Sequence, residues 1–258
     1  MKNFIAIILA AGQGSRLRPL TNNVPKVMIN INDKTILDRQ VEIFRELGAK
    51  EIIVVCGYKE NNVYNKNITK VINHEYLTTN MVHSLITARN YLNGETIITY
   101  GDIIFKKSVI QNLLNDKSEI LIPSDLNWES YWRLRNEDPL LDAESFVKLD
   151  SKKVKSLGQK AIRIEDIQGQ FIGVIKLSSN GIKDILREYD KCLISKECKM
   201  NAWQSGRTLK NAFMTDLLNN LAYKNKLSYI EINRGWFEID TIKDYEIVCK
   251  KIRKNQWK

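Results

Sequence analysis

The sequence contains no hydrophobic run long enough to cross a membrane, which limits the classes of protein to consider. A spanning helix needs about 20 consecutive apolar residues, whereas the apolar stretch at residues 4–11 is short and ends at a glycine-rich loop. The N-terminus also lacks the charged, apolar and small-residue segments of a signal peptide. We therefore expect a cytoplasmic protein that has no membrane partner.

Cysteine is scarce, and its spacing excludes the usual metal-binding motifs. The 258-residue chain has four cysteines, Cys56, Cys192, Cys198 and Cys249. Because cytoplasmic thiols are normally kept reduced, we expect all four to be free thiols in the core or on the surface.

The chain also lacks a nucleic-acid-binding motif, although it is basic. Forty Lys and Arg residues against thirty Asp and Glu residues give a formal net charge of +10, which attracts polyanions. The basic clusters at residues 152–160 and 250–254 carry no interleaved stacking aromatics, unlike typical nucleic-acid-binding surfaces. We interpret most of these lysines as solvated and expect no nucleic acid partner. The same positive field would favour a nucleoside triphosphate.

Strand and helix patterns alternate through most of the chain, which predicts an α/β fold. Strands separated by helices of this length indicate a doubly wound, mostly parallel, Rossmann-like sheet with ligands at the C-terminal ends of its strands. The expected strands are 4–9, 51–56, 68–72, 96–100, 145–149, 170–177 and 227–232, and the expected helices are 35–47, 80–91, 179–191, 209–223 and 242–252.

We find no internal repeat or linker, so we expect a single domain over residues 1–258. The nucleotide-binding part is expected at about residues 1–123. The regular pattern breaks after that point, and residues 124–170 are expected to form a small, insertion-like substrate lobe. The remaining sheet and helices are expected at 171–258.

The loop after the first strand has the composition of a polyphosphate site. Residues 9–26 read Leu-Ala-Ala-Gly-Gln-Gly-Ser-Arg-Leu-Arg-Pro-Leu-Thr-Asn-Asn-Val-Pro-Lys. Glycines let the backbone approach an anion and offer N–H groups to it, and Arg16 and Lys26 add two cations. A dinucleotide fingerprint would need a small residue in place of Leu17, and a Walker loop would need Gly-Lys-Ser/Thr. Both of these common loops are therefore excluded.

This segment resembles the signature of the nucleotidyltransferases that make sugar-nucleotides and CDP-alcohols, L-A-A-G-x-G-[ST]-R-L-x-P-L-T-x-x-x-P-K, at every position. The resemblance implies transfer of a nucleoside monophosphate from a triphosphate to a phosphorylated acceptor, with release of pyrophosphate. It implies that Arg16 faces the leaving β- and γ-phosphates and that Lys26 lies near the α-phosphate and the acceptor. The loop residues expected to bind the nucleotide are Ala10, Ala11, Gly12, Gln13, Gly14 and Ser15.

Two aspartates are candidate ligands for Mg²⁺, which prefers phosphate oxygens and one or two carboxylates. Asp102 follows the strand at 96–100, and Asp240 precedes the last helix. From the residues alone, a turn aspartate and a helix N-cap explain them equally well. The family, however, has metal-binding aspartates in a Gly-Asp at a strand end and in W-x-E-I-D-[ST]-x-x-D-Y, which residues 236–245 resemble. The resemblance thus implies Mg²⁺ at Asp102 and Asp240, with Glu238 a weaker candidate.

Further nucleotide contacts are expected after the third strand, where residues 78–84 resemble the T-N-x-x-x-S stretch of the cytidylyltransferase branch. Asn80 and Ser84 have helical i, i+4 spacing and would share a face. Ordinary helix capping is the alternative explanation of Asn80. Tyr58 is expected to border the base, and Gly101 to line the nucleotide site.

Residues 128–135, 142–144 and 169–173 resemble the corresponding stretches of the small cytidylyltransferases. These enzymes act on phosphocholine, hydroxyalkyl phosphonates or L-glutamine phosphate. The resemblance favours CTP as donor and L-glutamine phosphate as acceptor, giving CDP-L-glutamine for capsule modification. Phosphocholine, phosphonates and sugar 1-phosphates remain alternatives. The residues expected to bind the acceptor are Trp128, Tyr131, Arg135, Glu144 and Gly173.

The residues alone leave two acceptor head groups open. The tryptophans and tyrosine of this region and Trp203 and Trp236 could form a cage for a quaternary ammonium ion, or could belong to the core. Arg133 or Arg135, with an acidic residue at 142 or 144, would instead suit an amino acid. Two further classes are a regulatory module that binds a nucleotide without turnover and an RNA-binding protein. The joint presence of Lys26 and the two aspartates favours an enzyme.

Overall fold

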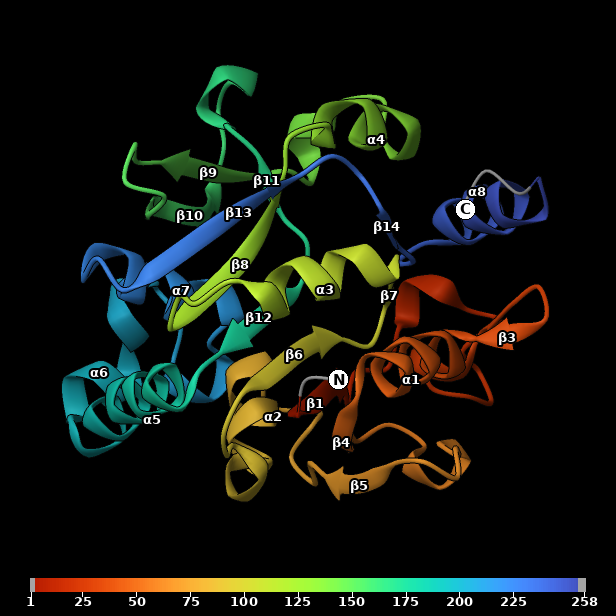
Figure 1. The fold of residues 1–258 in the computed structure, drawn as a ribbon, viewed down its shortest axis with the longest axis horizontal. Coiled ribbons are helices and arrows are strands. Elements are labelled where there is room, and N and C mark those ends of the chain that lie inside the picture. Colours follow the sequence, from red (N-terminus) through yellow and green to blue (C-terminus); the bar gives the residue numbers. More distant parts are fainter. Residues whose placement is uncertain (1–2, 255–258) are drawn as a thin grey trace.

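The computed structural model describes residues 3–254, and at its centre lies an eight-stranded, mostly parallel sheet (Figure 1). The strand order is β11-β8-β12-β6-β1-β4-β5, and β13 pairs with β8. The pairs of β12 and β11 with their neighbours are antiparallel, and the others are parallel. The sheet is formed by β1 (Phe4–Ala10), β4 (Ala49–Cys56), β5 (Thr69–Ile72), β6 (Thr96–Tyr100), β8 (Ile120–Asp125), β11 (Gln170–Phe171), β12 (Val174–Leu177) and β13 (Leu227–Ile232). This arrangement confirms the predicted fold class.

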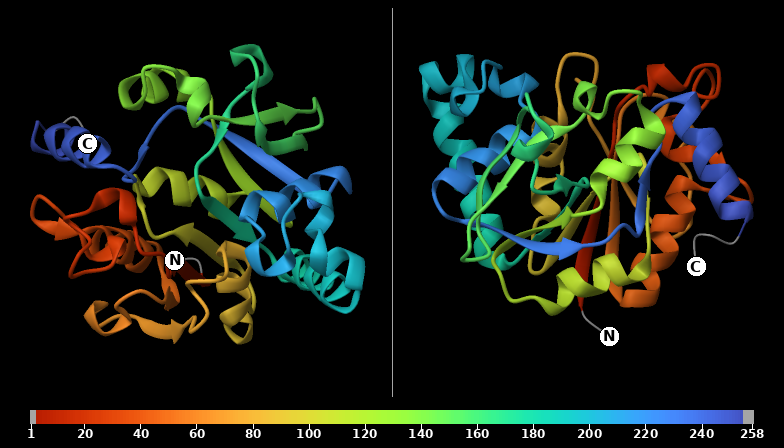
Figure 2. Two further views of the ribbon diagram at one scale, coloured as in Figure 1. Left: turned by 180° about the vertical axis from the view of Figure 1, so that it is seen from behind. Right: turned by 90° about the horizontal axis from the view of Figure 1, so that it is seen from above.

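Helices cover both faces of the sheet, which explains why its central strands are continuous apolar runs. In β1, Ala6 and Ile8 pack into the core that α1 and α3 cover, whereas Ile7 and Leu9 pack into the core under α2, α5 and α7. Figure 2 shows the helices on both sides of the sheet. The α-helices are α1 (Ile36–Leu47), α2 (Met81–Thr87), α3 (Lys107–Asn115), α4 (Trp128–Arg135), α5 (Ser179–Ile194), α6 (Lys196–Met200), α7 (Met214–Tyr223) and α8 (Ile242–Arg253). None of the described helices is long and apolar enough to cross a bilayer.

Short elements connect these layers. The 3-10 helices are η1 (Ser15–Leu17), η2 (Lys26–Met28), η3 (Glu60–Asn62), η4 (Arg89–Tyr91), η5 (Pro139–Leu141), η6 (Ile164–Asp166), η7 (Ala202–Gln204) and η8 (Leu209–Asn211). Three two-stranded ladders pair β2 (Asn30–Ile31) with β3 (Lys34–Thr35), β7 (Ile103–Phe105) with β14 (Trp236–Glu238), and β9 (Glu144–Lys148) with β10 (Val154–Lys160).

Local signals explain where several elements begin and end. The Thr35 side chain accepts a hydrogen bond from the Asp38 N–H at 2.9 Å at the start of α1, and Gly48 ends that helix with a φ of 95°. Side-chain capping and a left-handed glycine are common signals of this kind. The strands predicted at 96–100 and 227–232 are confirmed at both ends.

Three predicted elements are wrong in their extent because a break interrupts each one. Gly173 divides the strand predicted at 170–177 into β11 and β12, since its φ is 76° and a Cβ there would lie 2.6 Å from the Tyr100 ring. The helix predicted at 80–91 ends at Thr87 and is followed by η4. The helix predicted at 209–223 begins at Met214, because the Asp216 side chain accepts a hydrogen bond from the Phe213 N–H at 2.8 Å.

Cys192 and Cys198 form a disulfide between α5 and α6, so the prediction of four reduced thiols is wrong for this pair. The chain turns at Ser195, which brings the two Cα atoms to 5.0 Å, a distance that permits a disulfide. Cys56 and Cys249 are buried free thiols.

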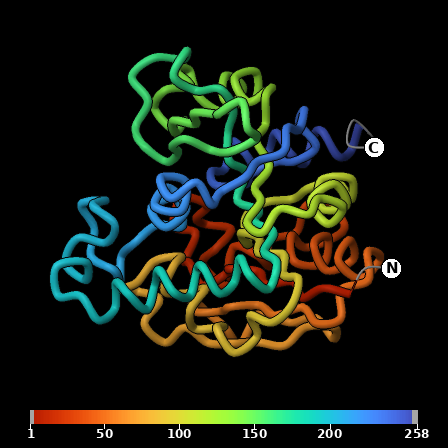
Figure 3. Tube along the Cα trace, turned by 60° about the vertical axis from the view of Figure 1, so that its left-hand side comes forward, coloured from red at the N-terminus to blue at the C-terminus, as the bar shows by residue number. Residues whose placement is uncertain are grey.

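The segment predicted as the substrate lobe, residues 124–170, contains α4 and the β9–β10 hairpin. In Figures 1 and 3 this green segment lies on the opposite side of the molecule from β4 and β5. At the C-terminus, Val248 of α8 packs with Leu17 and Ile36 in a separate small core. The last helix is thereby fixed to the loop that follows β1.

Candidate active site

The β7–β14 ladder brings the two predicted metal ligands together. Asp102 directly precedes β7, and Asp240 follows β14. Glu238 pairs with Ile103, and the Ile239 N–H donates to the Asp102 carbonyl at 2.8 Å. The aspartates therefore meet at the C-terminal ends of β1 and β6, where a parallel sheet places its ligands.

The approach of β6 to β1 at this edge requires a glycine. The Gly101 N–H donates to the Leu9 carbonyl at 2.8 Å, and a Cβ at Gly101 would lie 2.9 Å from that oxygen. Any side chain would therefore separate the two strand ends and displace the neighbouring Asp102.

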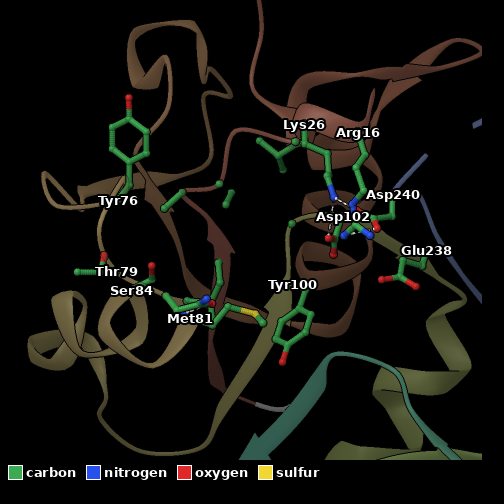
Figure 4. Close-up of a pocket in the computed structure, with 18 residues that line it drawn as sticks. Arg16, Lys26, Tyr76, Thr79, Met81, Ser84, Tyr100, Asp102, Glu238 and Asp240 are labelled. Atoms are coloured by element: carbon green, nitrogen blue, oxygen red, sulfur yellow. Dashed lines mark hydrogen bonds and ion pairs between the residues drawn. The ribbon is translucent and has the colours of Figure 1, made fainter. Parts of the chain in front are cut away.

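Lys26 lies between the two aspartates (Figure 4). Its Nζ is 3.0 Å from Asp102 Oδ2 and 2.7 Å from Asp240 Oδ1, and Arg16 Nη2 is 2.5 Å from Asp240 Oδ2. Burial opposes the charge on Lys26, but the two carboxylates outweigh burial and raise its pKa above the ordinary value. The ammonium group is therefore held charged at the point where the carboxylates converge.

The carboxylate pair fits the requirements of Mg²⁺. The Oδ1 atom of Asp102 is buried and has no hydrogen-bond partner among the described residues, and such an atom is costly to leave unsatisfied. No cluster of three or more His, Cys, Asp and Glu side chains suited to a metal forms within residues 3–254. Two carboxylates that leave room for phosphate oxygens are the arrangement that Mg²⁺ prefers over an all-protein cage.

These groups line one side of a cavity of about 310 Å³, named here the loop cavity. Gly12 exposes its backbone to it, since a Cβ at that position would meet nothing within 4 Å. The opposite side carries Tyr76, Thr79 and Ser84 (Figure 4). The lining residues are Leu9, Ala10, Ala11, Gly12, Gly14, Arg16, Lys26, Val27, Tyr76, Thr79, Asn80, Met81, Ser84, Tyr100, Gly101, Asp102, Glu238 and Asp240.

Three predicted nucleotide-binding residues, Gln13, Ser15 and Tyr58, are not among the lining residues of this cavity. The Tyr58 hydroxyl donates to the carbonyls of Thr21 and Asn22 at 3.1 and 3.2 Å. The Tyr58 N–H donates to the Ala11 carbonyl at 3.0 Å. Tyr58 therefore holds the loop by hydrogen bonds without lining the cavity.

Asn80 caps α2, as the alternative explanation predicts, and it also lines the loop cavity. Its side chain accepts a hydrogen bond from the Met81 N–H at 2.8 Å. Nearby, the buried Asn73 Nδ2 donates to Thr79 Oγ1 and Ser84 Oγ, each at 3.1 Å. Sequence reasoning did not single out Asn73 and Tyr76, which follow β5 at the same edge of the sheet, and it included Thr79 only as part of the stretch at residues 78–84.

A second cavity of about 270 Å³, named here the lobe cavity, shares Arg16, Met81, Tyr100 and Glu238 with the first. Its walls are acidic and aromatic. The lining residues are Arg16, Met81, Tyr100, Ile103, Trp132, Asp142, Glu144, Gln170, Phe171, Ile172, Gly173, Phe213, Thr215, Trp236 and Glu238. The two cavities therefore meet beside the carboxylates.

Burial changes the acidity of two carboxyl groups in this cavity. It raises the pKa of Glu144 to about 7, with a further contribution from Asp142. It also raises the pKa of Glu238 to about 7, where Arg135 opposes the shift and the aspartates at 102 and 240 add to it. Both groups thus exchange protons near neutral pH.

Two of the five predicted acceptor-binding residues, Glu144 and Gly173, line the lobe cavity, and Trp128, Tyr131 and Arg135 do not. These three side chains belong to α4 and are buried. Trp128 Nε1 donates to the Ile167 carbonyl at 3.3 Å. Trp132, from the same helix, does reach the cavity wall. The spacing of the four residues is that of one helix face, which is a signal for packing.

Residues 6–131 match the model of the MobA-like NTP transferase domain. The chain is 34% identical to the CTP:phosphoglutamine cytidylyltransferase of Campylobacter jejuni over 95% of this chain and 99% of that protein. It is 33% identical to the choline-phosphate cytidylyltransferase of Streptococcus pneumoniae over 52% of this chain and 54% of the relative.

Solved structures share the fold. The CTP:phosphocholine cytidylyltransferase of Streptococcus pneumoniae superimposes with a TM-score of 0.70 at 23% identity, covering 96% of this chain and 99% of that one. A UDP-glucose pyrophosphorylase superimposes with a TM-score of 0.72 at 16% identity, covering 97% and 98%.

Proposed function

Because this chain belongs to the family of nucleoside triphosphate transferases that includes CTP:phosphoglutamine cytidylyltransferase, we propose that it transfers CMP from CTP to L-glutamine phosphate. The products are CDP-L-glutamine and pyrophosphate. One observation carries the proposal: Lys26 lies between Asp102 and Asp240 where a loop cavity meets an acidic, aromatic lobe cavity. A capsule-related role and a cytoplasmic location belong to the same proposal.

In the proposed reaction, a phosphate oxygen of the acceptor attacks the α-phosphorus of CTP. The bond from that phosphorus to the bridging oxygen breaks, and pyrophosphate leaves with its electron pair. The protein aligns the two phosphates and neutralises the charge on their crowded oxygens. Asp102 and Asp240 would hold Mg²⁺, which supplies additional positive charge to the phosphates when bound.

The two cations that line the loop cavity, Lys26 and Arg16, are placed to neutralise charge on the phosphates. Lys26 pairs with both aspartates, so an arriving α-phosphate offers it a new anionic partner. Arg16 is 68% exposed and lines both cavities. We assign Lys26 to the α-phosphate and Arg16 to the β- and γ-phosphates. The bare backbone at Gly12 leaves room for the nucleotide to approach.

The lobe cavity suits an acceptor that carries a positive group. Asp142, Glu144 and Glu238 contribute negative charge, and Trp132 and Trp236 contribute aromatic walls, which attract ammonium groups. The α-ammonium of L-glutamine phosphate meets this requirement, and a neutral hexose ring does not. The aromatic walls also make phosphocholine the second candidate. In this proposal residues 124–170 form the substrate lobe of a single domain.

Recognition of the acceptor carboxylate is assigned differently from the sequence-based prediction. Arg133 is paired with Glu129 at 2.6 Å and is more than half exposed, and Arg135 is buried behind the cavity wall. Arg16 is the basic side chain among the described residues that line the lobe cavity. Because Arg16 is already assigned to the β- and γ-phosphates, we assign no arginine to the α-carboxylate of the acceptor.

A pyrophosphate-release screen in the presence of MgCl₂ tests the proposal. Four nucleoside triphosphates are crossed with L-glutamine phosphate, phosphocholine, a hydroxyalkyl phosphonate and a hexose 1-phosphate. We expect the highest kcat/KM for CTP with L-glutamine phosphate. A preference for UTP and a hexose phosphate would replace the proposal with a sugar nucleotidyltransferase. If no nucleoside triphosphate yields pyrophosphate, or if the protein binds RNA tightly with a steep salt dependence, the proposed enzymatic function is rejected.

A further inference from the structure

Arg135, in the predicted substrate lobe, bonds to two carboxylates close to Asp240 and does not line either cavity. Its side chain is 4% exposed and stacks on the rings of Tyr131 and Trp132, with its Cζ 5.3 and 5.1 Å from their centroids. Arg135 Nε donates to Asp244 Oδ1 at 2.9 Å, and Nη1 donates to Glu238 Oε2 at 2.6 Å. A fixed planar fork of this kind can hold two carboxylates at once.

Asp244 carries this connection on to the predicted metal ligand. Its Oδ2 accepts hydrogen bonds from the N–H groups of Asp240 at 3.1 Å and Thr241 at 2.9 Å. The backbone of Asp240 is therefore held by a carboxylate that Arg135 orients. The path from the substrate lobe to Asp240 has two steps, Arg135 to Asp244 and Asp244 to Asp240.

The second branch of the connection holds the strand that precedes Asp240. Glu238 closes β14, and the Tyr131 hydroxyl accepts from the Glu238 N–H at 2.9 Å and donates to its carbonyl at 3.0 Å. Arg135 holds the side chain of the same residue. The same Nη1 lies 3.6 Å from the Oδ2 atom of Asp142, a residue that lines the lobe cavity.

We propose that Arg135 is a positioning residue that acts through Asp244 and Glu238 to hold Asp240 where its carboxylate binds the divalent cation. This inference rests on the proposed function for the identity of the cation site, and it replaces the sequence-based expectation that Arg135 contacts the acceptor. Partners that orient a metal ligand typically change metal affinity or activity by about 10- to 100-fold when they are removed.

The test compares Arg135→Gln, Arg135→Lys and Asp244→Asn with the wild type. Mn²⁺ binding is measured by electron paramagnetic resonance with CTP present and no acceptor, so turnover is not needed. We expect Arg135→Gln to weaken Mn²⁺ binding on the order of tenfold or more and to lower kcat by a similar factor, with KM for CTP within about twofold. Arg135→Lys should recover part of the loss, because an ammonium group keeps the charge and loses the fork.

A double-mutant cycle separates this role from a general effect on stability. If Arg135 acts through Asp244, adding Asp244→Asn to Arg135→Gln lowers Mn²⁺ affinity little further, whereas independent effects multiply. If Arg135→Gln does not fold, Arg135→Lys and Asp244→Asn give the same comparison. Tm is recorded for every variant.

Arg234→Gln is the matched control. Arg234 stacks on the same Tyr131 ring, 4.0 Å from its centroid, and pairs with Asp125. Asp125 keeps hydrogen bonds from Trp236 Nε1 at 2.8 Å and from the Asn127 N–H at 3.1 Å. We expect this control to change Tm and the acceptor KM and to leave Mn²⁺ affinity within about twofold.

Two results would bear on different statements. A lower Tm for Arg135→Gln with unchanged Mn²⁺ affinity and kcat would overturn the positioning role. A wild type that binds Mn²⁺ with CTP and releases no pyrophosphate with any acceptor would reject the proposed function, and the Mn²⁺ comparison would still decide the role of Arg135.

Discussion

The loop cavity and the substrate lobe hold their charged groups in opposite ways. In the loop cavity, Lys26 and the two aspartates face the open space and pair with one another. Arg135 of the lobe is paired with carboxylates and stacked on Tyr131, and Arg234, which follows β13, is paired with Asp125 and stacked on the same ring. The first arrangement can exchange partners with a polyanion, whereas the second is a rigid support. We therefore propose that the loop cavity carries the chemistry and that the paired arginines hold the geometry of the site.

The largest expected effect is on turnover, from a substitution in the loop cavity. Asp102→Asn removes a charge at the carboxylate whose Oδ1 is buried without a partner. We expect kcat for pyrophosphate release to fall on the order of a hundredfold to a thousandfold, because Asp102 would no longer help to hold the cation that neutralises the phosphates. Tm should change little, since an amide keeps the size of the side chain and can still accept a hydrogen bond from Lys26.

The exposed Asp150 provides the control for this substitution. Asp150→Asn removes the same charge from the surface of the chain and should leave both kcat and Tm unchanged. Wild-type rates in Asp102→Asn would remove the metal-binding role from the proposal, whatever the control does.

The two regions also differ in how far the sequence predicts them. The loop that follows β1 is contiguous, so its glycines, Arg16 and Lys26 could be identified from residues 9–26 alone. The meeting of Asp102 with Asp240 depends on the β7–β14 ladder, and short strands of this kind leave a weak pattern. The family resemblance, rather than any local signal, paired these two residues.

The proposed substrate lobe could be predicted less well, because the lobe cavity is formed by packing between distant segments. Trp128, Tyr131, Trp132 and Arg135 recur at i, i+3, i+4 and i+7, which is the signature of a buried helix face. That spacing predicts α4 and its burial, and the family motif drew attention to acceptor binding instead. Phe213 reaches the lobe cavity from the start of α7, a placement that no local pattern indicates.

A second prediction, with an effect of intermediate size, concerns the pH dependence of the acceptor KM at the lobe cavity. Burial raises the pKa of Glu144 to about 7, so the group becomes ionised as pH rises through 7. Because an ionised carboxylate attracts the acceptor ammonium, we expect the acceptor KM to fall by about fivefold between pH 6 and 8, corresponding to ~1 kcal/mol for a partly exposed pair. The KM for CTP should change less. Initial rates at a series of pH values measure both constants.

Glu144→Gln is the variant that checks this assignment, and it should reduce the pH dependence of the acceptor KM, leaving the part that Glu238 contributes. The same shift has a consequence for stability. Since the folded-state pKa lies above the ordinary value of 4.5, the folded protein retains a proton that the unfolded chain releases, and the wild type should lose stability relative to Glu144→Gln as pH rises from 4.5 to 7. An unchanged pH profile in the variant would assign the titration to another group.

The substitution with the smallest expected effect on turnover tests the lobe itself. Tyr131→Phe keeps the ring that stacks on both arginines and removes the hydroxyl that bonds both backbone groups of Glu238. We expect the free energy of unfolding to fall by about 1–2 kcal/mol, measured by urea denaturation, with kcat within about twofold of the wild type. Tyr64→Phe, at a 75% exposed tyrosine, is the control and should change neither quantity. If Tyr131→Phe instead lowers kcat as strongly as Arg135→Gln, the hydroxyl contributes as much as the guanidinium to the placement of Asp240. The support that the lobe gives to the carboxylates would then extend along the whole of β14, because both substitutions would displace the same strand.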